Sequence, residues 1–349
     1  MMAVWESLAR DFDEFVVFAR SYTNRPAFST CGRVRFILLP SLGRRQLSFL
    51  LSSWLFVLYA VLKRPAVVVV QSPLHGGLPA NMGSRLAGSR FVVECHGDHY
   101  MKWRHSGRWD FRALAFIVGF VLRNADRVRA VNPMQATQLV EGYRVDARRI
   151  RVVPYRVDTD VFFPTEGDVD EQQAHRLLMA CSIVARKRVS VMLEVLNRLP
   201  ATFSAVVAGT GILEDEMLAL AQRLGLQSRV RFIGQVDHAR LAAEMRVSGI
   251  YLLLSDSEAM PRAILEAMAS GMVIVTTDVG VISDVVSEGV TGRFVPIDDI
   301  EATAAAVVSI ATDPCLYRSM RQNALDLACS MYGWDSMMSK YRTLLSDPC

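Results

Sequence analysis

The chain has 349 residues, of which 51% are hydrophobic and 21% charged, and at about 150 residues per domain this length predicts two domains. Ordinary counts of Gly and Pro, 21 and 13, exclude a disordered or collagen-like chain, and six scattered Cys exclude a small disulfide scaffold. The net charge of +4 divides unevenly, because residues 1–160 carry +11 and residues 161–349 carry −7. The basic half favours an anionic partner such as a membrane surface, a phosphorylated lipid or nucleic acid, although solvated arginines alone would give the same charge.

Acidic residues and the lack of a continuous apolar core in Met1–Arg20 argue against a secretion signal, so we expect a cytoplasmic protein. The apolar segment Leu47–Leu62 has two basic residues on each side. As a helix it would span about 24 Å, which is shorter than the roughly 30 Å hydrocarbon core of a bilayer. Two interpretations stay open: a helix packed inside an α/β domain, or a helix that lies in the membrane interface with its basic flanks on anionic headgroups.

Short β-branched runs recur along the chain with helical stretches between them. Apolar runs without strict alternation are typical of strands that are covered on both faces, and parallel strands need helical crossovers. We therefore expect an α/β fold with nine buried parallel strands: Val67–Gln71, Phe91–Cys95, Arg127–Val131, Ile150–Val153, Leu177–Cys181, Phe203–Ala208, Val230–Ile233, Ile250–Leu254 and Met272–Thr276.

The segment Pro154–Gln173 interrupts this pattern, because it is rich in Asp and Glu and has no periodic apolar face. We place the domain boundary there, which gives two Rossmann-like, doubly wound domains, 1–160 and 161–330. Residues 331–349 are expected to form a C-terminal helix that returns to the N-terminal domain. Ligands of doubly wound sheets bind at the carboxyl ends of the strands, so the two domains are expected to face each other across a ligand-binding cleft.

Two carboxylates, Glu258 and Glu266, stand eight residues apart after the strand Ile250–Leu254. A helix that begins near Pro261, a residue suited to a first helical turn, would place Glu258 on the preceding loop and Glu266 on its second turn. Both carboxylates would then face the strand ends, with the free N–H groups of the helix N-terminus between them. This arrangement suits a sugar nucleotide, because carboxylates accept hydrogen bonds from sugar hydroxyls while the N–H groups meet phosphate oxygens.

The Glu258-x7-Glu266 motif resembles the hallmark of glycosyltransferase family 4, a family of retaining enzymes with the GT-B fold that use nucleotide-diphosphate sugars. The resemblance runs from about Val67 to the end of the chain. Its other landmarks follow in the family's order: Val67–Pro73, Phe91–His96, Asn124-Ala-Asp126, Ile150–Asp158 with Phe162, Ala208-Gly-Thr-Gly211, Arg229–Gly234, Val279-Gly280, Gly289–Gly292 and a closing helix around Trp334.

The resemblance implies a donor site residue by residue. Glu258 and the backbone amides after it would hold the donor sugar and diphosphate, Glu266 would bind the ribose, and Lys187 would stabilise the leaving diphosphate. His96 would reach the donor sugar from the N-terminal domain, and it completes the expected catalytic set with Glu258 and Lys187. The other implied donor contacts are Ala259, Met260, Pro261, Arg262, Gly209, Gly211, Arg186, Ser182 and Gly280.

The acceptor side is less defined. Asp98 and His99 lie close to His96 in the sequence and could serve as an acid–base pair for an acceptor hydroxyl. The Gly-rich loop that normally follows the family's first strand is missing. We therefore expect Val34–Leu39 as the first strand, with Pro40-Ser41-Leu42-Gly43 as a minimal version of that loop.

Three departures from the family pattern concern the donor. Ser182 stands where an Arg is usual, so either Arg186 or Arg188 would take its place or the affinity for the donor would be reduced. Val281 replaces the second Gly of a Gly-Gly pair and would narrow the space for the donor. Tyr155-Arg156 stands in place of Asn-Gly.

We expect a retaining transfer of a sugar to a hydroxyl of a lipid-linked or cell-envelope glycan at the inner face of the membrane, without a cofactor. No metal is expected, because no His/Cys cluster has ligand spacing and Lys187 with the helix N-terminus would take the place of a cation. The basic half favours a lipid phosphate or membrane face over nucleic acid, with Leu47–Leu62 as a candidate contact. Two alternatives stay open: a soluble transferase that makes a small glycoside or exopolysaccharide unit, and a catalytically silent nucleotide-sugar-binding protein.

Overall fold

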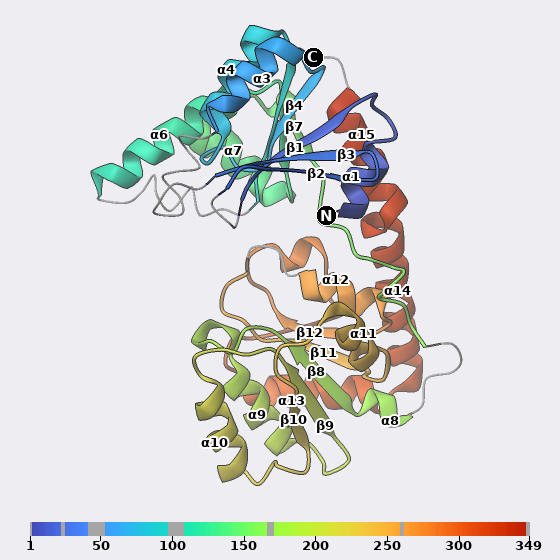
Figure 1. The fold of residues 1–349 in the computed structure, drawn as a ribbon. Helices are drawn as coiled ribbons and strands as arrows, with labels where there is room; N and C mark the ends of the chain where they lie inside the picture. Colours follow the sequence, from blue (N-terminus) through green and yellow to red (C-terminus); the bar gives the residue numbers. More distant parts are fainter. Residues whose placement is uncertain are drawn as a thin grey trace. The chain divides into compact units, whose positions relative to one another are not determined.

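A computed structural model of the chain describes residues 2–21, 25–40, 53–96, 108–165, 171–258 and 262–346. Contacts divide the chain into two compact units (Figure 1). The first unit holds Met1–Pro154 together with Met338–Cys349, and the second holds Tyr155–Met337. The chain passes from the first unit to the second at Pro154, where the acidic segment of the sequence begins.

The first unit contains two sheets. A four-stranded parallel sheet follows chain order, with β4 (Val67–Val70), β5 (Arg90–Glu94), β6 (Arg127–Ala130) and β7 (Ile150–Val152). A three-stranded sheet contains β1 (Phe15–Arg20), β2 (Ala27–Cys31) and β3 (Val34–Leu39). In this second sheet β3 lies in the middle, parallel to β1 and antiparallel to β2.

Helices cover both faces of the parallel sheet of the first unit. On one face, the core side chains of the strands pack against three crossover helices, α4 (Gly77–Ala87), α6 (Trp109–Arg123) and α7 (Pro133–Tyr143). On the other face, the end of α15 (Trp334–Ser346) places the ring of Tyr341 under the guanidinium of Arg129, at 5.3 Å. The remaining elements are α1 (Met2–Leu8), α3 (Leu55–Lys63) and a 3₁₀ turn at Ala147–Arg149.

A buried ion pair joins β5 to β6 in this unit. Glu94 lies opposite Arg129 in the register of the two strands, and the two side chains are 1% and 8% exposed. Arg129 Nη1 donates to Glu94 Oε2 at 3.0 Å, and its other nitrogens donate to the carbonyls of Val153 and Pro154 at 2.9 and 3.1 Å. Arg129 therefore ties the strand ends to the point where the chain leaves the unit.

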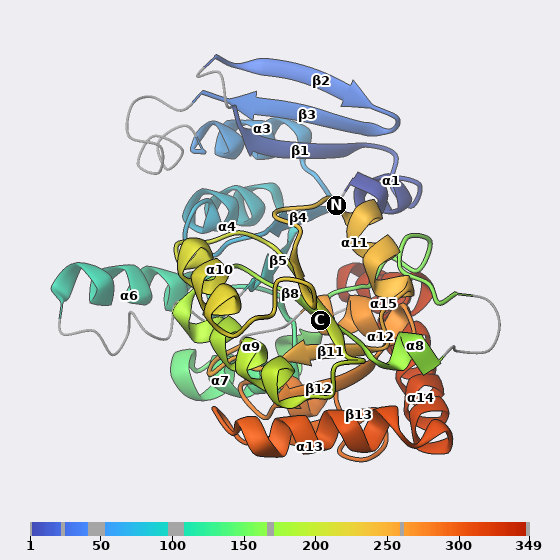
Figure 2. The same ribbon diagram turned by 90° about the horizontal axis from the view of Figure 1, so that it is seen from below.

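The apolar segment Leu47–Leu62 is described from residue 53 onward, and residues 47–52 lie outside the described residues. Its described part forms α3, which lies beside α4 in both ribbon views (Figures 1 and 2). Ala60 is buried, whereas Leu55, Leu58 and Leu62 each leave more than half of their surface exposed. One side of α3 therefore packs and the other faces solvent. None of the described helices has the length and apolar character needed to cross a membrane.

The second unit is built on a six-stranded parallel sheet in the order β10-β9-β8-β11-β12-β13. All residues of β11 and β12 are buried, which is typical of parallel strands covered on both faces. The strands are β8 (Arg176–Ala180), β9 (Ser204–Ala208), β10 (Val230–Phe232), β11 (Ile250–Leu253), β12 (Val273–Thr277) and β13 (Gly292–Val295).

Helices form a core on each face of this sheet. α9 (Val189–Arg198), α10 (Glu214–Arg223) and α13 (Ile300–Ala311) belong to one core, and α11 (His238–Arg246) and α12 (Arg262–Ala269) belong to the other. α14 (Pro314–Tyr332) contributes to both. Asp side chains cap α11, α13 and α14 by accepting first-turn N–H groups. The short elements are α8 (Glu171–Ala174) and 3₁₀ turns at Ala185–Lys187 and Ile282–Asp284.

All nine strands expected from the apolar runs are present, each within one residue of its predicted bounds. Three other strands were missed: β1, β2 and β13. The expectation that Val34–Leu39 is the first strand is wrong, because β1 precedes it. β2 has no buried apolar run, since four of its five residues are exposed, and β13 begins with Gly292 and Arg293, which leaves only two apolar residues in the strand. Gly43 and the loop around it lie outside the described residues.

We expect Arg129→Met to lower the free energy of unfolding of the first unit by about 3–5 kcal/mol, because it leaves the buried Glu94 carboxylate without its cation. Urea denaturation measures this loss. The matched control is Arg148→Met, since Arg148 is 90% exposed and pairs with Asp146 at the surface. That control should unfold at the wild-type urea concentration. Equal effects of the two substitutions would contradict the role assigned to Arg129.

Candidate functional site

Four loops of the second unit meet at the carboxyl edge of its sheet. They follow β8, β9, β11 and β12, which are neighbours in the parallel sheet and therefore end at the same side. The loop after β8 is held to the loop after β9, where Ile183 N donates to Thr210 O at 3.0 Å. It is also held to the loop after β11, where Asp256 N donates to Arg186 O at 3.0 Å.

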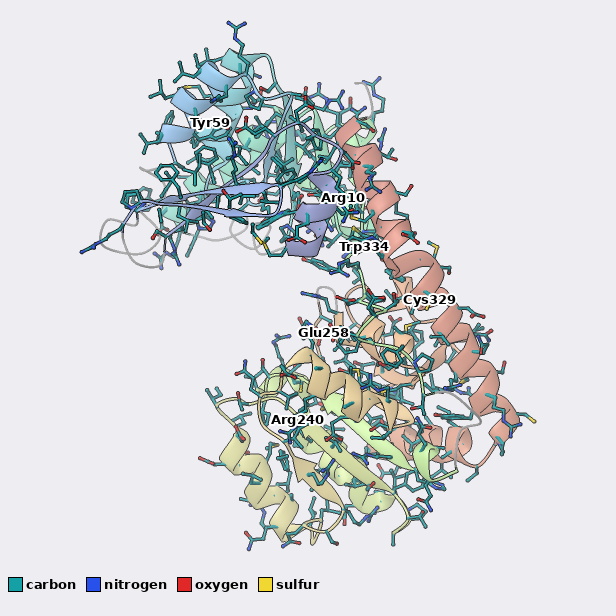
Figure 3. All side chains as sticks on the ribbon, turned by 45° about the vertical axis from the view of Figure 1, so that its right-hand side comes forward. Arg10, Tyr59, Arg240, Glu258, Cys329 and Trp334 are labelled. Atoms are coloured by element: carbon teal, nitrogen blue, oxygen red, sulfur yellow. The ribbon has the colours of Figure 1, made fainter. Side chains whose placement is uncertain are left out.

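The centre of this edge is an ion pair between Lys187 Nζ and Glu258 Oε1. The two side chains are 12% and 8% exposed, so the pair is largely removed from water. Arg186 lies beside it and donates from Nη1 to the carbonyl of Ser257 at 3.2 Å. Figure 3 labels Glu258 among the side chains of the second unit. Sequence reasoning named all three side chains separately, and the fold brings them together.

Two glycines allow the loops to approach each other backbone to backbone. A Cβ at Gly280 would lie 1.8 Å from the carbonyl oxygen of Glu258, and one at Gly209 would lie 1.9 Å from that of Cys181. Both residues also have positive φ, 66° and 129°. Any side chain at either position would therefore displace the loop that carries Glu258 or the loop that leads to Lys187.

α12 carries the second expected carboxylate. Glu266 is 9% exposed on the second turn of this helix, and burial raises its pKa above the ordinary value of 4.5, while Arg262 and His238 oppose the shift. Arg262 lies at the first turn, with its guanidinium 5.7 Å from the ring centre of Tyr155. The expected donor contacts Ala259, Met260 and Pro261 lie outside the described residues.

The departures from the family pattern have structural counterparts. Ser182 is exposed, and Val281 is 3% exposed, so the valine side chain is packed into the unit rather than placed at its surface. Arg188 is engaged away from Lys187, because it pairs with Asp298 at 3.1 Å and Asp256 at 3.4 Å. Both arginines that were considered as substitutes for the missing one therefore contact the loop of Glu258, Arg188 at Asp256 and Arg186 at the carbonyl of Ser257, the residue before Glu258.

The first unit carries the remaining expected catalytic residue. His96 follows β5, is 29% exposed, and its Nε2 lies 3.0 Å from Glu94 Oε2. The same carboxylate oxygen accepts from Arg129. Because the Glu94 carboxylate can only accept, it holds the Nε2 proton of His96. Asp98 and His99 lie outside the described residues.

Sequence reasoning missed the residues that support these side chains. The sequence places Arg129 in the expected strand Arg127–Val131 and gives it no role of its own. Two arginines in alternation, Arg127-Val-Arg129, in a strand expected to be buried nevertheless indicate a buried charge that needs a partner. The surroundings of Cys181 had no signal. Burial raises the pKa of this thiol to about 11, although the nearby Lys187 lowers it. Cys181 is therefore an uncharged thiol next to the site.

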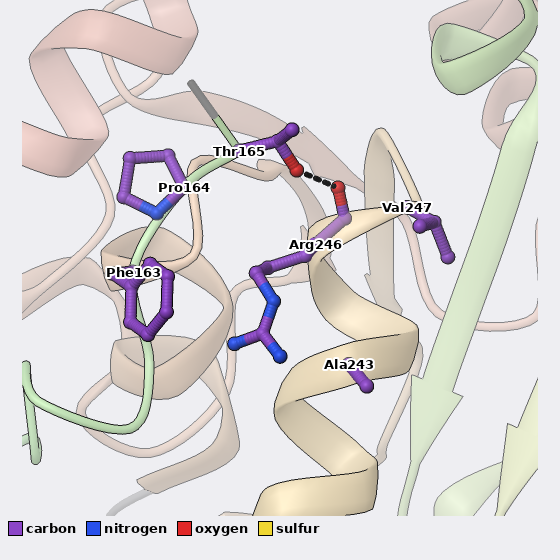
Figure 4. A pocket seen from close by; sticks show the side chains of 6 residues that line it. All are labelled: Phe163, Pro164, Thr165, Ala243, Arg246 and Val247. Atoms are coloured by element: carbon purple, nitrogen blue, oxygen red, sulfur yellow. Dashed lines mark hydrogen bonds between the residues drawn. The ribbon is translucent and has the colours of Figure 1, made fainter.

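Metal ligands do not gather in the described part of the chain, where no three His, Cys, Asp or Glu side chains form such a cluster. A pocket of about 680 Å³ on the second unit is separate from the site (Figure 4). It lies between residues 163–165 and α11, where Arg246 stacks on Phe163 at 4.6 Å and accepts at its carbonyl from Thr165. No expected site residue lines it.

We expect Glu266→Gln to stabilise the protein increasingly as pH rises. A raised native pKa means that the folded state binds the proton more tightly than the unfolded chain, so wild-type stability falls as pH rises from about 4.5 through the native pKa. The amide does not titrate. Urea denaturation at several pH values measures the difference. Glu301→Gln, at a 72% exposed carboxylate, is the control and should show no such growth. A difference independent of pH would refute the desolvation of Glu266.

Two family models match the chain and together cover most of it. "Glycosyl transferase 4-like domain" matches residues 1–156, and "Glycosyl transferases group 1" matches residues 169–326. The first match ends close to the boundary of the first unit, and the second lies within the second unit. Each half of the chain therefore corresponds to one half of a known type of transferase.

Curated relatives include the D-inositol 3-phosphate glycosyltransferase of Kribbella flavida, which is 29% identical over 248 residues, or 64% of this chain and 58% of that protein. The phosphatidyl-myo-inositol mannosyltransferase of Mycolicibacterium smegmatis is 36% identical over 132 residues, or 37% of this chain and 33% of that protein. The chain therefore aligns with little more than half the length of the first relative and a third of the second.

A solved structure of HepE from Anabaena, in complex with UDP and glucose, has a TM-score of 0.75 to this chain at 15% identity, and the match covers 99% of this chain and 95% of that one. A likeness at this identity shows the fold, which is GT-B. The family models, the relatives and this fold agree with the Glu258-x7-Glu266 motif. The chain belongs to glycosyltransferase family 4.

Proposed function

We propose that this chain is a retaining glycosyltransferase that moves a sugar from a nucleotide-diphosphate sugar to a hydroxyl of a lipid-linked or cell-envelope glycan, in the cytoplasm at the inner face of the membrane. The observation that carries the proposal is the nearly buried Lys187–Glu258 pair at the carboxyl edge of the six-stranded sheet of the second unit. It sits where doubly wound sheets bind ligands, and it combines a cation for phosphate with a carboxylate for hydroxyl groups.

The site offers one group for each part of the donor. Lys187 neutralises the diphosphate. When Lys187 leaves Glu258 to bind the phosphate, Glu258 accepts hydrogen bonds from sugar hydroxyls. Glu266 accepts from the ribose diol, and the close backbone at Gly209 and Gly280 keeps side chains out of the way. Support for a nucleotide of this kind comes from the HepE structure, which contains UDP and glucose. No metal and no cofactor are included in the proposal.

The transfer needs no carboxylate nucleophile. The bond between the anomeric carbon and the departing phosphate oxygen breaks, and its electron pair stays on that oxygen. The acceptor oxygen bonds to the anomeric carbon on the same face, and its proton passes to the departing phosphate oxygen. Lys187 stabilises the negative charge that grows on the diphosphate, which is the largest electrostatic demand of the step. His96, whose Nε2 proton is held by Glu94, accepts at Nδ1 from a hydroxyl of the donor sugar.

The acceptor is assigned to the first unit, whose sequence half carries the net charge of +11. Excess positive charge favours phosphorylated lipid over a neutral glycoside. The similarity to a phosphatidyl-myo-inositol mannosyltransferase supports a lipid acceptor, and that to a D-inositol 3-phosphate glycosyltransferase supports the second candidate, a soluble transferase that acts on a small phosphorylated acceptor.

We expect Glu258→Gln to reduce transfer at least about a hundredfold, a loss typical of removing one preorganised polar group from an active site. Donors are first found by thermal shift, because a nucleotide sugar at about 100 times its dissociation constant stabilises its site by roughly 2.7 kcal/mol. Transfer to a lipid-phosphate acceptor is then followed by product formation, and the anomeric configuration of the product is read by NMR.

Glu301→Gln is the control for Glu258→Gln, because it removes an exposed carboxylate of the same unit. Unchanged turnover of the Glu258 variant would refute the site. An inverted anomeric centre would refute retention. A wild-type protein that binds nucleotide sugars but transfers to no acceptor would be a silent binding protein.

We expect Glu94→Gln to lower kcat about tenfold or more with little change in the KM of the donor, by analogy with the carboxylates that orient metal-ligating histidines, whose loss typically costs 10- to 100-fold. In a His96→Ala background the same substitution should lower kcat no further, because Glu94 acts on the reaction through His96. Each Glu94 variant is less stable, since the buried Arg129 loses its anion. Steady-state kinetics of the two single variants and the double variant measure this. An additional loss in the double variant would show that Glu94 acts independently of His96.

A further inference from the structure

The surface of the first unit carries an apolar stripe along α3. Leu55, Leu58 and Leu62 are 56%, 61% and 72% exposed. Their spacing of three and four residues places them on one side of the helix. Trp54 and Val61, at 44% and 40%, fall beside them. Soluble proteins rarely gather so many large apolar side chains on one exposed face, so this stripe indicates an interaction surface.

The packing of α3 on α4 fixes which side of α3 faces outward. Gly83 of α4 meets α3 closely, since a Cβ there would lie 3.1 Å from both Ala60 Cβ and the ring of Phe56. Phe56 and Ala60 therefore point inward. On α4, Met82 and Leu86 flank this contact and are 40% and 61% exposed. We call the surface formed by Leu55, Leu58, Leu62, Met82 and Leu86 the α3–α4 patch.

The charged side chains of α3 and α4 are all basic. Burial and the nearby Glu14 carboxylate raise the pKa of Tyr59 on α3, and this carboxylate pairs with Arg35 at 2.8 Å. Between Glu14 and Glu94 the sequence contains no Asp or Glu, and it contains ten basic residues: Arg20, Arg25, Arg33, Arg35, Arg44, Arg45, Lys63, Arg64, Arg85 and Arg90. Three of them border the patch, because Lys63 and Arg64 end α3 and Arg85 precedes Leu86 on α4. An apolar stripe with basic edges is the pattern of a helix that lies in a membrane interface.

A second stripe of the same kind runs along α6, which packs beside α4 (Figures 1 and 2). Trp109, Phe116 and Phe120 are 82%, 71% and 40% exposed and share one side of the helix. Arg112 lies between the first two of them and is exposed as well. Trp and Phe beside Arg are the side chains that favour the headgroup region of a bilayer.

We propose that the α3–α4 patch docks the protein on an anionic bilayer surface, with Leu58 and Leu62 in the acyl boundary and the basic residues at the C-terminal end of α3 and on α4 among the headgroups. A second copy of this chain is a poor occupant, because two tracts that lack carboxylates would repel each other. This inference rests on the proposed function, because docking on the bilayer would bring the protein to a lipid-linked acceptor. Vesicle binding is nevertheless measured without donor or acceptor.

The experiment is flotation of the full chain with vesicles of phosphatidylcholine that contain about 30% phosphatidylglycerol, at about 0.05 M and about 0.5 M NaCl. Pure phosphatidylcholine vesicles are the comparison. We expect the protein to float with the anionic vesicles at low salt, less at high salt, and little with the neutral ones. Failure to float with anionic vesicles at low salt would overturn the proposal.

Two variants test the apolar and the charged parts separately. Leu58→Gln/Leu62→Gln should reduce binding about tenfold or more because buried apolar area is lost, and Lys63→Gln/Arg64→Gln should reduce it about fivefold per cation. Ile212→Gln is the control, since Ile212 is 89% exposed on the second unit and should bind as the wild type does. Thermal melts establish that all variants are folded, as expected for exposed positions.

The possible outcomes separate this proposal from the proposed function. The proposal would be overturned if the Leu58→Gln/Leu62→Gln variant floated with anionic vesicles as the wild type does, or if the Ile212→Gln control lost as much vesicle binding as that variant. A wild-type dimer that this variant dissociates, without any vesicle binding, would assign the patch to self-association and overturn it too. A thermal shift with UDP in the same variant reports the donor site alone, so loss of membrane binding with UDP binding retained would support the patch.

Discussion

The parallel order of β9, β8, β11 and β12 is the constraint on which the candidate site depends. Because all four strands run in one direction, their following loops end at one edge, and residues as distant in sequence as Lys187 and Glu258 become neighbours. Gly209 and Gly280 allow those loops to touch through their backbones. The polar side chains therefore stand on short, tightly held loops, which is what preorganised binding of a charged ligand requires.

Each unit contains a buried carboxylate that a cationic side chain neutralises. In the acidic half Lys187 neutralises Glu258, and in the basic half Arg129 neutralises Glu94. The first pair lies on the loops at the carboxyl edge of the sheet, where we propose that the donor binds. The second is enclosed by the carbonyls of Val153 and Pro154 and serves to hold His96. Net charge of a half is thus a poor guide to the charge that a ligand meets locally.

Most of the fold follows from the sequence, because buried parallel strands need uninterrupted apolar runs and these runs are easy to locate. Two of the missed strands had no such run: β2 is an exposed edge of a small sheet, and β13 contains Gly292 and Arg293. The third, β1, does contain an apolar run, Phe15–Ala19, and was overlooked. Glu258, Glu266, Lys187 and Arg186 were found from a motif and its resemblance to a family. Glu94 and Arg129 were not, because their pairing depends on the register of β5 and β6.

The sequence by itself determined the two-part α/β plan through its apolar runs, the family through the resemblance of its motifs, and the types of side chain available for the proposed nucleotide-sugar donor. The tertiary structure decided which of those side chains meet. It turned Arg188 toward Asp256 and Asp298, left Arg186 beside Glu258, and packed Val281 away from the surface. It also placed the leucines of α3 at the surface, since Gly83 brings the other side of the helix, with Phe56 and Ala60, against α4. Hydropathy alone does not determine which side of such a helix packs, whereas the close contact of Gly83 with the side chains of Ala60 and Phe56 does.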